Sequence, residues 1–206
     1  MSDRLPSLIV VSGPAGAGKS TILARVLEEM RNLRFSVSHT TRAARDGETE
    51  GVHYHFVDRF KFESMRARQE FVESAEVHGQ FYGTSRAEYD RAAADGVDLL
   101  LDLDVQGAAQ VRKSGLPAVS IFVLPPDFAT LEDRLRRRAS EDPAALALRL
   151  HEARREAMEY DHFDYVVFNA DLEDASGELA SIVRAERARC ARRRERVKTV
   201  MATFPS

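Results

Sequence analysis

Several features that mark other protein classes are scarce in this chain. Its 206 residues include one cysteine, Cys190, which excludes an intramolecular disulfide and fits a reducing compartment. No apolar run approaches the roughly 20 residues of a membrane span, and the first residues lack the charged-then-apolar pattern of a secretory signal. The formal net charge of −3 gives no general argument for a nucleic-acid or membrane partner. A cytoplasmic location is therefore expected.

A glycine-rich segment near the N-terminus matches the spacing G-x-x-x-x-G-K-[ST]. It follows the apolar run 8–11 and precedes a helical pattern, the context in which such a loop binds phosphate. Its residues are Gly13, Pro14, Ala15, Gly16, Ala17, Gly18, Lys19 and Ser20, followed by Thr21. The glycines let the backbone approach an anion, Lys19 supplies charge for the β- and γ-phosphates, and the Ser20 hydroxyl suits Mg²⁺. The context disfavours the alternative, a glycine-rich turn without a chemical role.

The hydrophobic pattern predicts an α/β fold in a single domain over residues 1–206. Short apolar segments alternate with helical patterns, which indicates an open parallel sheet with helices on both faces. The segments expected as strands of this sheet are 8–12, 34–38, 97–104, 119–124 and 165–168. The core is assigned to residues 5–37, 90–130 and 160–198. A last helix is expected from about Asp174, and its arginine-rich run 184–198 is interpreted as a solvated face in preference to a nucleic-acid contact.

Residues 38–89 do not follow this alternation of strands and helices, and they are predicted to form an inserted, mostly antiparallel lobe. Within it we expect a strand at 52–57, a helix at 60–68 capped by Asp58, and a hairpin of 71–77 with 80–84. Residues from about 131 to 159 are predicted to form a helical lid that carries arginines. Its two helices are expected at 128–138 and 143–160, the second with Asp142 as N-cap.

Two arginines lie in the polar loop that follows the expected strand 34–38. Arg42 and Arg45 suit a second anion, because a guanidinium can grip a phosphate by two parallel hydrogen bonds. Tyr54 adds a neutral donor. From these residues alone, a solvated charged loop is an equally good interpretation.

A carboxylate in the expected hairpin bears on the identity of the acceptor. If a nucleobase binds beside Glu73, the carboxylate accepts from two adjacent donors, which guanine offers at N1–H and its 2-amino group and adenine does not. Ser38 and Thr84 would then face the O6 edge, with Tyr82 nearby. Taken singly, however, Glu73 is better interpreted as an ordinary exposed strand residue.

The predicted lid contains the third group of candidate residues. Arg134 and Arg138 are four positions apart and share a helix face, and Arg149 follows on the next helix. Arginines that close over a transferred phosphoryl group stabilise its charge, and a hinged segment would also exclude water. An arginine-rich surface helix is the alternative.

Two aspartates end the apolar segment 97–104, at the edge where open α/β sheets bind ligands. Asp102 is expected to hold Mg²⁺ or its waters, and Asp104 to orient the acceptor. His53 and His55 are predicted to share one face of a strand. With no cysteine and no third ligand nearby, a surface position is favoured over a metal site.

Together these motifs resemble the guanylate kinases along nearly the whole chain. The resemblance rests on residues 13–21, 35–42, 45–48, 54–57, 70–73, 82–84, 102–107 and 124–126, and on the lid arginines. The combination of Ser-x-Thr-Thr-Arg at 38–42 with Asp-x-Asp-x-Gln-Gly at 102–107 is specific, whereas the phosphate loop alone is not. Two departures are Ala170, where the family usually has aspartate, and Arg137-Arg138-Ala139, where it commonly has Gly-Arg-Gly.

The resemblance implies a P-loop NTPase-type fold. It also implies that the protein uses ATP and Mg²⁺ to phosphorylate GMP to GDP, and that it acts on dGMP in the same way. This places the chain in purine nucleotide metabolism and GMP recycling. Carried over by motif, the ATP-binding residues are 13–21 with Asn169 and Ala170, and the metal ligands are Ser20 and Asp102. The implied GMP-binding residues are Ser38, Arg42, Arg45, Glu48, Tyr54, Glu73, Tyr82, Thr84 and Asp104. The implied catalytic residues are Lys19, Arg45, Arg134, Arg138 and Arg149.

Two other functions compete with this one. Guanylate-kinase-like modules that bind peptides in scaffold proteins usually lack a working phosphate loop, which is intact here at Gly18-Lys19-Ser20. A related kinase acting on a ribose bisphosphate would have no reason to keep Glu73 with Ser38. The expected partners are therefore ATP and GMP, without nucleic acid or membrane, and the oligomeric state is left open, a homo-oligomer included.

Overall fold

The computed structural model describes residues 6–77, 79–138 and 143–205, without the side chain of Arg138. Its centre is a five-stranded sheet in the order β2-β7-β1-β8-β9, and all neighbouring strands are parallel. These strands are β1 (Leu8–Ser12), β2 (Leu33–Phe35), β7 (Asp98–Asp102), β8 (Ala118–Leu124) and β9 (Tyr165–Phe168). The central ones are apolar along most of their length because both faces of the sheet are covered. The predicted open parallel sheet is confirmed.

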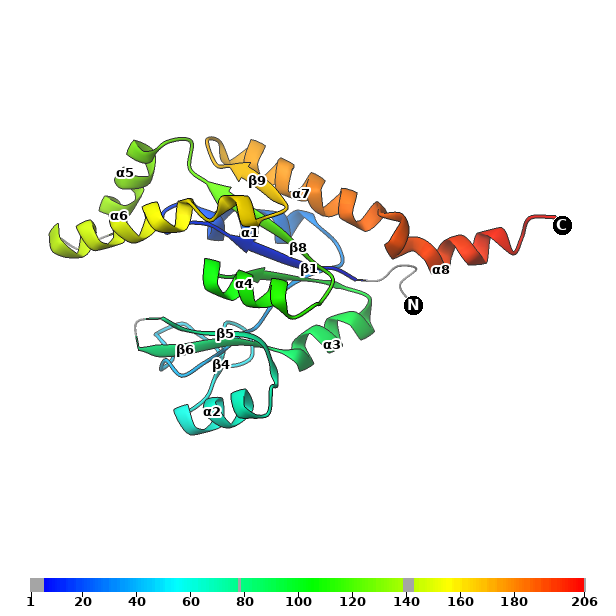
Figure 1. The fold of residues 1–206 in the computed structure, drawn as a ribbon, viewed down its shortest axis with the longest axis horizontal. Helices are drawn as coiled ribbons and strands as arrows, with labels where there is room; N and C mark the ends of the chain where they lie inside the picture. Colours follow the sequence, from blue (N-terminus) through cyan, green and yellow to red (C-terminus); the bar gives the residue numbers. More distant parts are fainter. Residues whose placement is uncertain (1–5, 78, 139–142, 206) are drawn as a thin grey trace.

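Helices cover both faces of this sheet (Figure 1). On one face, α1 (Lys19–Glu29) and α7 (Leu172–Ala188) pack on β1 and β8. On the other, α3 (Arg86–Asp95) and α4 (Val105–Lys113) pack on β1 and β7. The parallel register sets Val11 beside Asp102, so β1 and β7 end side by side. The loops that follow these two strands therefore meet at one edge of the sheet.

The inserted segment forms a separate four-stranded sheet in the order β4-β3-β6-β5. Its strands are β3 (His39–Thr40), β4 (His55–Phe56), β5 (Phe71–Val77) and β6 (Gln80–Ser85). β6 pairs antiparallel with β3 and β5, and β3 pairs parallel with β4, so the lobe is mostly antiparallel. Helix α2 (Arg59–Ala67) covers one face through stacking of Phe62 on Phe71 and Phe81, and Asp58 caps it as predicted.

The strand predicted at 52–57 is wrong over its first half. A turn occupies residues 51–53, and only His55–Phe56 pair in the sheet. Gly51 adopts a left-handed φ of 73°, and its amide donates to the Tyr54 carbonyl at 2.9 Å, which closes the turn. His53 and His55 consequently do not share a face, because His53 lines a cavity between the two sheets and His55 lines another cavity with His39.

Helices α5 (Phe128–Arg138) and α6 (Pro143–Ala157) form a pair at the end of the sheet where β1 terminates (Figure 1). They pack on each other through Leu131, Leu135 and Ala153 rather than through the main core. The predicted N-cap, Asp142, lies outside the described residues. The pair therefore corresponds to the predicted lid region, with its own small apolar contact.

The C-terminal helix predicted from Asp174 is two helices, because Arg189 is extended (ψ 134°) between α7 and α8 (Cys190–Met201). Helix α8 has no buried residue and extends away from the body of the molecule (Figure 1). The solvated face predicted for the arginine-rich run is confirmed for most of α8. It is wrong for Arg187, which bonds the buried Asp98 at 2.7 Å, and for the half-buried Arg192, which donates to the Pro6 carbonyl at 3.2 Å. None of the described helices is long and apolar enough to cross a membrane.

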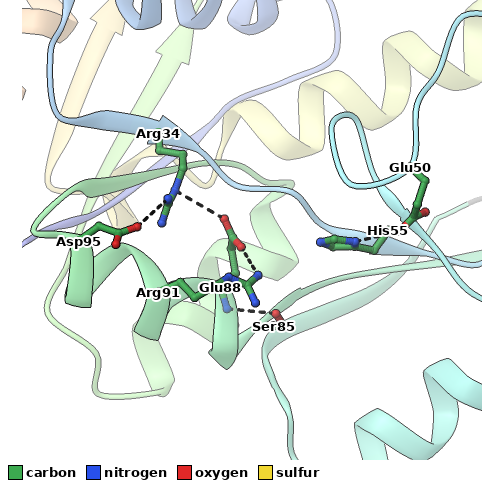
Figure 2. A network of polar contacts seen from close by, with 7 residues as sticks. All are labelled: Arg34, Glu50, His55, Ser85, Glu88, Arg91 and Asp95. Atoms are coloured by element: carbon green, nitrogen blue, oxygen red, sulfur yellow. Dashed lines mark hydrogen bonds and ion pairs between the residues drawn. The ribbon is translucent and has the colours of Figure 1, made fainter.

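A polar network joins the core to the helix that leaves the inserted lobe (Figure 2). Arg34, on β2, lies 3.0 Å from Asp95 and 3.9 Å from Glu88, both on α3. Glu88 is buried, bonds Arg91 at 2.5 Å, and its amide donates to the N-cap Ser85 at 3.2 Å. The start of α3 is therefore fixed to the parallel sheet by charge as well as by packing.

Candidate active site

The glycines of the phosphate loop are required by its backbone path. Gly13 has a φ of 142°, and a Cβ there would lie 2.2 Å from the Val123 carbonyl oxygen. Gly18 has a φ of 89°, and a Cβ there would lie 2.2 Å from the amide nitrogen of Asn169. The loop therefore passes close to β8 and to the residue after β9, and no other amino acid fits at these two positions.

Lys19 and Asp102 lie together beneath the loop. The Lys19 ammonium donates to the Gly13 carbonyl at 2.7 Å and lies 4.0 Å from Asp102. Burial raises the pKa of Asp102, and the Lys19 charge lowers it. Asp102 keeps 31% of its side-chain surface exposed, so it borders the cleft although protein surrounds it on most sides. The pair therefore places a positive charge and a carboxylate oxygen, which can bind a hard metal ion, next to the phosphate loop.

The donor set fits a magnesium ion that arrives with phosphates. Ser20 is exposed in the first turn of α1, and Asp102 ends β7 at the same edge of the sheet. Within the described residues, no group of three or more His, Cys, Asp or Glu side chains could hold a metal. Mg²⁺ is commonly bound through one or two protein oxygens, phosphate oxygens and waters, which is what these two residues can offer.

A cavity of about 310 Å³ lies between the two sheets. The parallel sheet contributes residues at and beyond the ends of β2 and β7, and the mixed sheet contributes β5 and β6. Its polar lining residues are Ser36, Ser38, His53, Tyr54, Glu73, Tyr82, Asp102 and Asp104. Six of them were predicted as site residues, whereas Ser36 and His53 were not. Asp102, which lines the cavity, lies 4.0 Å from Lys19, so an occupant of the cavity would lie next to the phosphate loop.

Glu73 is buried at the inner end of this cavity, with 5% of its surface exposed. The Thr84 amide donates to its Oε1 at 2.8 Å, and the Ser38 and Thr84 hydroxyl oxygens lie 3.5 Å apart. Burial raises the pKa of Glu73, and the contacts with Thr84 oppose this. The interpretation of Glu73 as an exposed strand residue is wrong. The structure brings Ser38, Glu73 and Thr84 together, although they come from three separate segments.

Arg42 lies beside Tyr54 and Tyr82, two of the residues that line this cavity. The Arg42 guanidinium donates to both carboxylate oxygens of Glu48, at 2.9 and 2.8 Å, and lies 5.3 Å from the centre of the Tyr54 ring. The Tyr54 and Tyr82 rings are 6.0 Å apart, edge to face. This arrangement excludes a solvated loop for Arg42, whereas the Arg45 side chain is exposed.

Glu48 orients this arginine. Besides the Arg42 pair, it accepts from the Arg45 amide at 2.8 Å. The Arg42 hydrogen bonds and the Arg45 amide lower the pKa of Glu48 to about 2, and the same pair raises that of Arg42. Both groups are therefore charged throughout the neutral pH range, with the guanidinium held beside the two tyrosines.

Asp104 caps the helix that follows β7. Its Oδ1 accepts from the Gly107 amide at 2.7 Å, so it fixes the start of α4 while it lines the cavity. A Cβ at Gly107 would lie 3.2 Å from Glu73 Oε2 and 3.3 Å from Asp104 Oδ1. The glycine therefore lets α4 begin close to both carboxylates.

A second cavity, of about 340 Å³, lies on the other side of the phosphate loop. Its lining residues are Gly16, Gly18, Thr21, Arg134, Arg137, Asn169, Ala170 and Leu172. Asn169 is buried and donates to the Ala17 carbonyl at 2.7 Å, and Arg134 donates to the same carbonyl at 3.3 Å and to that of Asn169 at 3.1 Å. The predicted ATP residues Asn169 and Ala170 thus lie beside the loop.

The remaining lid residues are not gathered around the loop. Arg149 is exposed on α6, and the side chain of Arg138 lies outside the described residues. Two other residues of the predicted lid do approach the loop region. Arg137, the neighbour of the predicted Arg138, lines the second cavity, and Glu156, which the sequence did not single out, accepts from the Ala15 amide at 3.3 Å. Nothing in the local sequence marks Glu156, since α6 is rich in charged side chains.

A phosphate loop on a parallel sheet, next to a cavity shared with an inserted sheet, is the arrangement of a P-loop nucleoside monophosphate kinase. Comparison with known proteins narrows this class. The family model described as guanylate kinase matches residues 6–186, and the chain belongs to the guanylate kinase family.

Relatives and a solved structure agree with this assignment. A guanylate kinase of Desulfotalea psychrophila is 48% identical over 186 residues, which is 90% of this chain and 92% of the relative. One from Neisseria gonorrhoeae is 47% identical over 88% of this chain and 89% of its own length. The crystal structure of guanylate kinase from Anaplasma phagocytophilum superposes with a TM-score of 0.78 at 35% identity, covering 98% of this chain and 97% of that one. The chain is therefore similar to these proteins across both lobes.

Proposed function

We propose that this guanylate kinase transfers the γ-phosphoryl group of ATP to GMP, producing ADP and GDP, in the cleft between the two sheets. The observation that carries the acceptor assignment is the buried carboxylate of Glu73. Its Oε1 is bonded to Thr84, which leaves Oε2 to face a ligand. A carboxylate in this position pairs with the N1–H and 2-amino donors of guanine, whereas adenine lacks both.

The two halves of the reaction have separate sets of residues. Residues 13–21 would bind the phosphates of ATP through backbone amides and Lys19, and Asn169 and Ala170 would border its base. Ser38 and Thr84 would contact the guanine, and Arg42, Arg45, Tyr54 and Tyr82 its phosphate. The remaining predicted GMP residues, Glu48 and Asp104, would act by holding Arg42 and the start of α4. This division agrees with a core that binds the donor, a lobe at 38–89 that binds the acceptor, and a lid at about 131–159.

Ser20 and Asp102 are the residues that would hold Mg²⁺ with the ATP phosphates. When bound, the ion neutralises charge on the β- and γ-phosphates. The protein needs no general base, because the attacking oxygen of GMP belongs to an ionised phosphate. Lys19 and the arginines at positions 45, 134, 138 and 149 would stabilise the negative charge on the phosphoryl group during its transfer, and the lid would exclude water. The single cysteine agrees with action in the cytoplasm.

The acceptor is tested by release of ADP from ATP with GMP, dGMP, AMP, CMP or UMP as the second substrate. We expect kcat/KM to be high for GMP and dGMP, which share the guanine base, and low for the other three, because only guanine satisfies the buried Glu73. Calorimetric titration with ATP alone tests the donor site separately. Turnover of AMP equal to that of GMP would contradict the guanine assignment, and no ATP binding would favour a non-catalytic binding module.

We also expect Glu48→Gln to raise the KM for GMP by about three- to tenfold while kcat changes by less than about twofold. The glutamine keeps one acceptor oxygen but removes the charge that holds Arg42 in its two-bond contact. Steady-state kinetics with GMP varied at saturating ATP measures the effect. Glu63→Gln is the matched control, since Glu63 forms an exposed pair with Arg59 on α2. An unchanged KM would show that Glu48 does not position the guanidinium.

A further inference from the structure

We infer that Glu156 acts as an internal substitute for phosphate, bound to the loop in the ATP-free enzyme and displaced when ATP enters. The inference rests on the proposed function only in taking the loop to bind the phosphates of ATP. Glu156 lies on α6, in the lid region, 141 positions along the chain from its partner in the loop.

The first observation is the contact itself. The Glu156 Oε2 accepts from the backbone amide of Ala15 at 3.3 Å. The amides of a phosphate-binding loop are donors that point at an anion, and a carboxylate is the anionic group that a protein side chain can place there. The lid carboxylate thus uses a donor that the phosphates of ATP need.

The second observation is the electrostatic setting of Glu156. Burial raises its pKa, and the Ala15 amide and the nearby Lys19 charge lower it. Both groups that favour its ionised form belong to the phosphate loop. The carboxylate is therefore stabilised by the same positive groups that would otherwise stabilise a nucleotide phosphate, while Asp104 and Glu152 act against it.

These two anions cannot share the site. Two negative charges in contact repel each other, more strongly at a protein surface than in water, so a phosphate at the loop would drive Glu156 away. Because Glu156 belongs to α6, its departure requires α6 or the side chain to move. Binding of the phosphates is thereby coupled to the position of the Glu156 side chain and, where α6 moves with it, to the helix that carries Arg149.

The competition lowers the apparent affinity for ATP. If the carboxylate occupies the loop in a fraction of the free enzyme, the measured Kd increases by the reciprocal of the free fraction. Removing it should tighten binding, which is the opposite of what damage to the loop or lid would do. If Glu156 had a purely structural role in the lid, replacing it would not lower the Kd for ATP.

The experiment is calorimetric titration of Glu156→Gln and Glu156→Ala with ATP and with inorganic tripolyphosphate, in EDTA so that metal ligation does not contribute. We expect both ligands to bind about three- to tenfold more tightly than to the unmodified protein, which corresponds to about 70–90% occupancy of the loop by Glu156. Glu152→Gln is the matched control, because it removes the same charge one turn earlier on α6, from an exposed position.

The outcomes separate this inference from the proposed function. If the unmodified protein binds neither ligand, the proposed donor site fails. If it binds them, and Glu156→Gln and Glu156→Ala bind them equally or more weakly, the substitute role of Glu156 is overturned. If Glu152→Gln tightens binding as much as Glu156→Gln does, the effect is one of overall charge and the inference also fails. Tighter binding in the two Glu156 variants alone supports it.

Discussion

Replacing Glu73 by glutamine is expected to lower kcat/KM for GMP by about 10²- to 10³-fold. Glutamine fits the same space and can still accept from the Thr84 amide, as Glu73 Oε1 does at 2.8 Å. Its amide nitrogen would then face the cleft, and a donor would meet the N1–H and 2-amino donors of guanine. The change therefore removes two hydrogen bonds to a charged acceptor and leaves unpaired donors in a buried site.

The same substitution should leave the free energy of unfolding unchanged or slightly higher. Burial raises the pKa of Glu73 above its value in the unfolded chain, so ionising this carboxyl costs more in the folded state, and stability is lost as pH rises through the folded-state pKa. Glutamine is neutral at every pH and avoids this cost. Thermal unfolding with steady-state kinetics separates the two effects. Glu76→Gln, an exposed position on the other face of β5, is the control, and unchanged GMP kinetics in Glu73→Gln would remove that residue from the site.

Structural features that depend only on neighbouring residues could be predicted from the sequence. The phosphate loop was predictable because Gly13 and Gly18 meet backbone requirements that no other residue satisfies. The buried strands were predictable because parallel sheets need continuous apolar runs. The start of α2 followed from its capping residue, Asp58. These features involve residues within a few positions of each other, so a short sequence motif or a hydrophobic periodicity is enough to predict them.

Contacts between distant segments were not predictable in the same way. Glu73 gives no sign in the sequence of being buried, because its burial comes from Thr84 across the hairpin and from Gly107 at the start of α4. The alternation of apolar and polar residues in 52–57 indicated a strand, but a turn that begins at Gly51 occupies the first half of this segment. For Glu73, the resemblance to the guanylate kinases supplied what the local pattern lacked.

Arg187 is the clearest case of a residue whose role comes only from tertiary structure. It belongs to the arginine-rich run interpreted as a solvated face, yet 18% of its side chain is exposed. Its Nε donates to Asp98 at 2.7 Å, and its Nη2 donates to the carbonyls of Arg31 and Asn32 at 3.0 and 2.9 Å. Asp98 itself is fully buried at the start of β7. The guanidinium therefore joins α7 to the edge of the parallel sheet.

We expect Arg187→Met to lower the free energy of unfolding by about 3–5 kcal/mol, because it removes the charged hydrogen bond to the buried Asp98 and the two bonds to the carbonyls of Arg31 and Asn32. For a domain of this size, the thermal midpoint should fall by on the order of 10 °C. Urea unfolding should show a lower midpoint with an unchanged slope. Arg184→Met, an exposed position three residues earlier on α7, is the control and should change stability by less than about 0.5 kcal/mol.

A double substitution separates loss of packing from loss of charge pairing. Arg187→Met combined with Asp98→Asn removes the buried charge together with its partner, while the asparagine oxygen can still accept from the Ser7 amide that bonds Asp98 at 2.6 Å. We expect the double variant to be more stable than Arg187→Met alone, because a buried carboxylate that has lost its bond to Arg187 costs more than a neutral group that keeps a hydrogen bond. Equal stability would mean that Arg187 acts through packing and its two carbonyl contacts. A change below about 1 kcal/mol in Arg187→Met would show that the ion pair contributes little to the fold.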